Sequence, residues 1–147
     1  MGLFSGFGSK DLMDKEFNTF EAASGVLLSV VASDGEISDE EVDTFSLLAN
    51  RHPIFVQQSP HEFRRMIDEQ FSILRKRGWE ALADKASSHL PSNLRPTVFA
   101  LAVDLVLADG RVEVAEEKMI DSLRRKLGVE EEDARRIVEV LALKNGA

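Results

Sequence analysis

One acidic turn occurs twice in this sequence, and this repetition constrains the fold more than any other feature. The first acidic turn spans residues 34–41 and the second acidic turn spans residues 109–116. Both read Asp-Gly-x-(Ile/Val)-x-x-x-Glu, both follow an apolar run, and 75 residues separate the two aspartates. Self-similarity at a constant offset indicates a repeated structural unit. The sequence therefore predicts an internal duplication with two pseudo-symmetric halves, at about 12–51 and 92–127.

Helical periodicity dominates the chain outside these turns. Apolar residues recur at intervals of three and four, and no stretch alternates apolar and polar residues convincingly over the length of a strand. Start signals agree with this pattern: Ser59-Pro60-His61-Glu62 combines an N-cap serine, a proline at the first helical position and a glutamate three residues after the serine. Short connections between such helices are typical of an all-α bundle. We predict about seven helices, at 12–33, 38–51, 59–78, 79–90, 92–108, 114–127 and 131–144.

The length of 147 residues is that of one ordinary domain, which can bury a full core without disulfides or zinc. We expect a flexible N-terminal segment at 1–10 and a single all-helical domain at 11–147. The start of the chain lacks the features of a signal peptide. Its longest apolar runs, 22–32 and 98–108, reach only about half the roughly 20 residues that span a bilayer. We therefore expect a soluble, cytoplasmic protein.

Charge and cysteine content narrow the possible partners. The formal net charge of −8 argues against binding to nucleic acid, whose phosphates would be repelled, and favours cations or basic partners. Cysteine is absent, which excludes thiol redox chemistry and thiolate metal ligands and fits a reducing compartment.

The acidic turns resemble the second half of an EF-hand calcium loop, where glycine, an aliphatic residue and glutamate follow in this order. In a standard loop, two further ligands would precede the turn. These positions hold Val30 and Ala32 in the first copy, and Leu105 and Leu107 in the second. None of these side chains can bind a hard cation, so a standard EF-hand is excluded.

The carboxylates that remain can still supply oxygen ligands, of which a hard cation needs several. Two facing turns could share one site. The candidate metal ligands are six acids: Asp34, Glu40, Glu41, Asp109, Glu116 and Glu117. We expect calcium rather than magnesium or zinc, because the three histidines lie outside the turns. No organic cofactor is indicated.

A structural role for the turns is the alternative. Asp-Gly ends a helix well, and acids in the first turn of a helix favour its macrodipole. Ser38 and Glu41 form the pattern of a capping box, which accounts for the glutamate of the first turn. In the second turn Glu113 replaces the serine and is a poor N-cap, so Glu116 has no such explanation. A structural role is favoured somewhat for the first turn, whereas the two roles are nearly balanced for the second.

Signals for catalysis are weak, and we predict no enzymatic activity. The sequence has no nucleophile elbow, no glycine-rich phosphate loop and no histidine beside a catalytic partner. Paired carboxylates acting on a small substrate are the least favoured interpretation. Asp104 interrupts a strongly apolar stretch, and a buried carboxylate there would need a partner. We expect instead that Asp104 lies on the exposed side of its helix.

Together the two turns, with their neighbours at 31–41 and 108–117, resemble the doubled signature of the TerB family of tellurite-resistance proteins. The resemblance extends to the helix around 63–74 and to Leu127-Gly128-Val129. It implies an all-helical fold of two pseudo-symmetric halves, an acidic metal-binding surface and a place among tellurium and general stress-response systems near the membrane. It implies no established catalytic activity. The chain departs from the pattern by lacking cysteine and by placing Arg111 where the first copy has a glutamate.

The expected function is a non-enzymatic acidic helical module that binds a divalent cation and couples it to protein partners in a tellurium or stress response. Those partners would be other stress-response or tellurite-resistance components. Any membrane association would be peripheral and run through them. The alternative is a metal-independent interaction scaffold, in which an apolar groove between helices recognises the partner.

Overall fold

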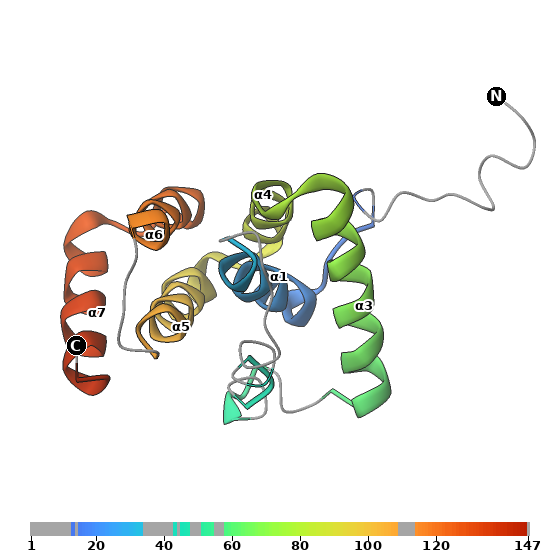
Figure 1. Cartoon of the computed structure of the whole chain (residues 1–147), viewed down its shortest axis with the longest axis horizontal. Coiled ribbons are helices and arrows are strands. Elements are labelled where there is room, and N and C mark those ends of the chain that lie inside the picture. The colour runs from blue at the N-terminus through green and yellow to red at the C-terminus, as the bar shows by residue number, and fades with distance from the viewer. Residues whose placement is uncertain are drawn as a thin grey trace, which may run out of the picture.

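The computed structural model describes residues 13, 15–33, 43, 45–47, 51–54, 58–108 and 114–146. These residues form helices and no strand, which confirms the all-α prediction (Figure 1). The elements are α1 (Thr19–Val31), α3 (Pro60–Arg77), α4 (Trp79–His89), the 3-10 helix η2 (Ser92–Leu94), α5 (Arg95–Leu107), α6 (Val114–Leu127) and α7 (Glu131–Lys144). Residues 43, 45–47 and 51 are also helical, within the helix predicted at 38–51.

Both acidic turns and the N-terminal segment at 1–10 lie largely or wholly outside the described residues. The internal duplication and the flexible N-terminal segment therefore stay predictions. No single helix in the described part of the chain has both the length and the apolar composition needed to cross a membrane. Among these described residues, one pair of helices, Trp79–His89 and Ser92–Leu107, meets both conditions when taken together, and it is bent by 119°.

α1 is the central helix of the fold. Apart from Thr19 and Glu21 all its residues are buried, so it is apolar or small around its whole circumference. A helix of this kind is stable only when other elements cover every side of it. Figure 1 shows how this is achieved: α3 lies on one side of α1, α5 and then α6 and α7 lie on the other, and α4 packs against α1 from above in this view.

The start of α1 differs from the prediction, which placed the first helix from residue 12. Asn18 is the N-cap: its side chain accepts a hydrogen bond from the Glu21 backbone N–H at 2.8 Å, and the Glu21 carboxylate accepts one from the Asn18 N–H at 3.1 Å. This reciprocal capping box satisfies two backbone donors that would otherwise lack partners. The helix consequently begins at Thr19.

The segment that precedes α1 is fixed by Lys85 of α4. The Lys85 Nζ donates hydrogen bonds to the backbone carbonyls of Met13, at 2.8 Å, and of Lys15. The same ammonium group lies 4.5 Å from the centroid of the Phe17 ring, and only 8 % of Lys85 is exposed. A buried lysine requires such partners because an isolated buried charge is costly.

Lys15 ties the same segment to two helices. Its Nζ lies 2.9 Å from the Glu21 carboxylate on α1 and 2.8 Å from the Glu69 carboxylate on α3. Burial lowers the pKa of the Lys15 amine, but hydrogen bonds to Glu69 and Glu21 outweigh burial and hold the pKa above its ordinary value. The stabilisation from this charge is therefore present at neutral pH and is lost only as the pH rises through the raised pKa.

Asp104 on α5 is not on the exposed side of its helix, contrary to the sequence-based expectation. Its side chain is 17 % exposed and lies 3.1 Å from the Lys144 Nζ. The Asn145 side-chain amide donates a hydrogen bond to it at 2.7 Å. The carboxylate thus has a cation and an amide as partners, both from the end of α7, and it fastens α7 to α5.

Replacing Asp104 with alanine is expected to lower the free energy of unfolding by about 2 kcal/mol, since hydrogen bonds to a partly buried charge are lost together. Urea denaturation measures the change. Glu132→Ala is the matched control, because its partner Arg136 is 4.0 Å away and both side chains are exposed. The control is expected to cost under about 0.5 kcal/mol. Equal effects of the two substitutions would show that Asp104 stabilises the fold no more than an exposed ion pair does.

Candidate functional site

Two of the six predicted metal ligands are placed by the structure. Glu116 and Glu117 stand in the first turn of α6, where Glu116 is half-buried and Glu117 is exposed. The other four, Asp34, Glu40, Glu41 and Asp109, lie outside the described residues, so their prediction stays untested.

The first turn of α6 does not make a metal site by itself. Neighbouring residues of an α-helix project about 100° apart around its axis, so Glu116 and Glu117 face different directions. Calcium takes roughly six to eight oxygen ligands. Among the described residues, no group of three or more His, Cys, Asp or Glu side chains could hold a metal ion. A cation site at α6 would need further ligands from the acidic turns.

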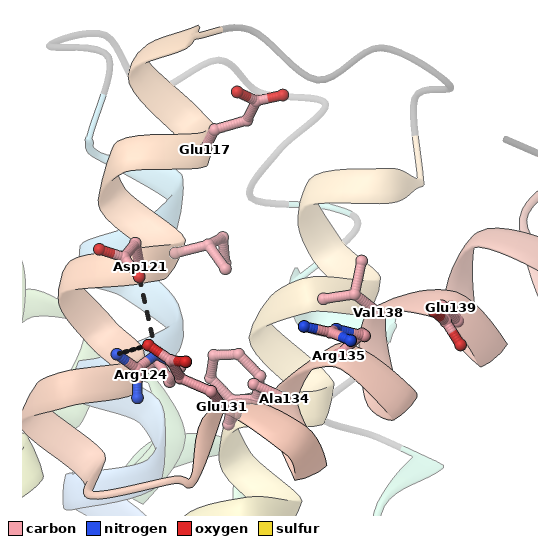
Figure 2. A pocket seen from close by; sticks show the side chains of 10 residues that line it. Glu117, Asp121, Arg124, Glu131, Ala134, Arg135, Val138 and Glu139 are labelled. Carbon is pink, nitrogen blue, oxygen red and sulfur yellow. Dashed lines mark ion pairs between the residues drawn. The ribbon is translucent and has the colours of Figure 1, made fainter.

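A groove lies between α6 and α7 (Figure 2). These two helices lie on the side of the molecule away from α3 (Figure 1). Both helices pack on α5, but they make few contacts with each other, because the turn around Gly128 sends α7 away from α6. The space left between them measures about 360 Å³. We call it the α6–α7 groove.

Four apolar residues and six charged residues line the α6–α7 groove. The apolar lining comes from all three helices: Phe99, Ile120, Ala134 and Val138. The charged lining comes from the two walls: Glu117, Asp121, Arg124, Glu131, Arg135 and Glu139. Apolar side chains therefore form part of the lining. Because carboxylates outnumber guanidinium groups, the charged part of the lining is acidic.

Arg124 lies at the end of the groove where α6 is followed by α7, as Figure 2 shows. Its guanidinium group donates a hydrogen bond to the Val129 carbonyl at 3.0 Å and lies 3.6 Å from the Asp121 carboxylate and 3.8 Å from the Glu131 carboxylate. The Arg124 side chain is only 17 % exposed. It therefore links the end of α6 to the start of α7 and neutralises part of the acidic lining.

Three charges at the edges of the groove remain available. Glu117, Arg135 and Glu139 form no ion pair with another residue in the described ranges. Figure 2 shows Glu117 on the α6 wall, with Arg135 and Glu139 on the α7 wall. The unpaired charges of the groove are thus one guanidinium group and two carboxylates.

The sequence did not locate this groove. The prediction placed Val138 inward with Ile137 and Leu141, but Val138 is 37 % exposed at the groove wall, while Ile137 and Leu141 are half-buried. The available signal was the excess of apolar residues on α7. Packing of α7 against α5 does not bury all of its apolar residues, and Val138, Val140 and Leu143 stay exposed.

The fold is that of a small all-helical module, and more carboxylates than guanidinium groups line its groove. The family model for the tellurite resistance protein TerB matches residues 20–139, from α1 into α7 and across both acidic turns. The chain therefore belongs to the TerB family of tellurite-resistance proteins, as the doubled signature suggested. No curated protein and no solved structure matches the chain.

Proposed function

We propose that this TerB-family chain is a non-enzymatic helical module that binds a divalent cation, calcium before magnesium or zinc, and couples it to protein partners in a tellurium or stress response. The observation that carries the proposal is the family match, because residues 20–139 include both acidic turns. The net charge of −8 and the absence of cysteine support oxygen-ligated cation binding in the cytoplasm. Contact with a membrane would be peripheral and run through the partners.

The ligands in this proposal are Asp34, Glu41, Asp109 and Glu116, with Glu40 and Glu117 beside them. The positive end of the α6 macrodipole opposes a cation at the second turn, so several carboxylates must act together. A bound cation would relieve the repulsion among these carboxylates and tie the two turns to each other. Since the ion binds the folded chain, it would raise stability, by about 2.7 kcal/mol at a hundred times its Kd.

Calorimetric titration with calcium, magnesium, manganese and zinc tests the metal part. Calcium is expected to bind with a Kd below about 1 mM, and Asp34→Asn combined with Asp109→Asn is expected to weaken binding at least about tenfold. Asp133→Asn is the control, because it removes an exposed carboxylate from α7. The metal part fails if no ion binds below about 1 mM, or if the double variant binds as the wild type does.

The second candidate function is a metal-independent scaffold that recognises partners through a groove between helices. The α6–α7 groove, with its apolar interior and a volume of about 360 Å³, favours this alternative. It predicts the same thermal midpoint with calcium and with a chelator. Cation binding predicts a higher midpoint with calcium, because a ligand of the folded state must stabilise it.

A further inference from the structure

We propose that the α6–α7 groove binds a segment of a partner protein in which aliphatic side chains stand next to lysine or arginine. The inference rests on the protein-partner part of the proposed function; it shares Glu117 with the candidate cation ligands, so its test is made without a divalent cation. Shape, apolar lining and charge each contribute to it.

The shape of the groove suits side chains rather than a whole partner helix. A volume of about 360 Å³ lies at the lower end of the range of ligand pockets, about 300–1,000 Å³. At one end Arg124 links α6 to the start of α7 through the Val129 carbonyl and the Glu131 carboxylate. This link helps to hold the two walls apart before a ligand arrives, which lowers the ordering needed on binding.

The apolar lining supplies the affinity. Ile120 on α6, Val138 on α7 and Phe99 on α5 all line the groove. Val138 is 37 % exposed, so an aliphatic side chain seated beside it removes further apolar surface from water. The groove therefore takes leucine-like or valine-like side chains.

The unpaired charges of the groove determine which residues of the partner are favoured beside its aliphatic side chains. Glu117 on α6 and Glu139 on α7 have no ion pair with another described residue. Asp121 is instead paired with Arg125 and Arg124, and Glu131 with Arg124. A lysine or arginine beside the anchor would meet the Glu117 and Glu139 carboxylates, and an acidic residue would find only Arg135. Exposed pairs add little affinity each, but they discriminate between oppositely charged ligands. The net charge of −8 steers the encounter in the same direction.

Fluorescence polarisation in EDTA tests the inference with two labelled peptides. One is Gly-Lys-Leu-Lys-Leu-Lys-Gly, and the other carries glutamate in place of lysine. The lysine peptide is expected to bind at least about tenfold more tightly than the glutamate peptide. Val138→Trp, at an exposed position, is expected to abolish binding by filling the groove.

A charge-matched pair of variants separates the groove from general attraction to an acidic protein. Glu117→Gln with Glu139→Gln is expected to weaken binding of the lysine peptide about fivefold or more. Glu132→Gln with Asp133→Asn removes two exposed carboxylates that do not line the groove, and is expected to leave binding nearly unchanged. Equal losses in both double variants, or equal binding of the two peptides, would overturn the inference.

The location of binding is checked by amide chemical shifts of the labelled chain, which are expected to change along α6 and α7. Shift changes confined to other helices would contradict the inference. It would also be contradicted if a second copy of the chain occupied the groove and competed with the peptide. Glu139→Gln alone must weaken peptide binding and leave calcium titrations unaltered. For the unmodified chain, absence of peptide binding with intact calcium binding would reject the groove alone, and absence of calcium binding with intact peptide binding would reject the cation site alone.

Discussion

Replacing Gly25 with alanine is expected to lower the free energy of unfolding by about 2 kcal/mol, although alanine is the better helix former by about 1 kcal/mol. A Cβ atom at Gly25 would lie 2.8 Å from the Ala86 Cβ on α4. Ala86 is fully buried, and its Cβ is attached directly to the backbone, so the two helices themselves would have to move apart. α1 is buried on every side, so this movement would disturb the whole core.

A double-mutant cycle provides the control. Ala86→Gly removes the atom that the new methyl group would meet, so the double variant should recover part of the stability lost in Gly25→Ala. The coupling is expected to be at least about 1 kcal/mol, within the range for residues in contact. Gly25→Val should cost about 3 kcal/mol or more. Urea denaturation gives the free energy of unfolding of each variant relative to the unmodified chain. A gain in stability from Gly25→Ala would contradict the close approach of α1 and α4.

Replacing Lys85 with methionine is expected to cost about 3 kcal/mol, because the carbonyls of Met13 and Lys15 would lose their donor and the Phe17 ring its cation. Methionine keeps most of the volume of the side chain, so the change isolates the ammonium group. The segment before α1 should also become more sensitive to proteases, because it loses these hydrogen bonds to α4.

Lys118→Met is the control for this substitution, because Lys118 is an exposed lysine on α6. It is expected to change stability by no more than about 0.5 kcal/mol. Chemical denaturation and limited proteolysis at residues 13–18 are read together. If Lys85→Met behaves as the control does in both assays, the buried ammonium group does not fix this segment.

Much of the helical architecture could be predicted from local sequence. The helices expected at 114–127 and 131–144 coincide with α6 and α7, and Ser59 caps α3 as its pattern indicated. Periodicity and capping residues act within a few positions, so they can be read without the tertiary structure. The start of α1 was missed by seven residues, because the capping box at Asn18 and the contacts of Lys85 outweigh the helical pattern before residue 18.

The groove and the role of Asp104 could not be predicted in this way. Asp104 is paired with Lys144, 40 residues further along the chain, and no local pattern joins the two. The groove depends on how α6 and α7 diverge over α5, which depends on tertiary packing. Val138 was expected to lie inward because its spacing fits the helical face, yet the partner that would cover it is absent from the described part of the chain.

The cation site is the central claim, and an amide NMR titration of the labelled chain with calcium tests it most directly. The account predicts saturable shift changes at residues 34–41 and 109–117, with a common Kd at both turns. The same titration of the variant Asp34→Asn with Asp109→Asn should leave these signals nearly unmoved. Absence of saturable changes at the turns, or changes confined to the exposed acids at 130–133 of α7, would contradict the account.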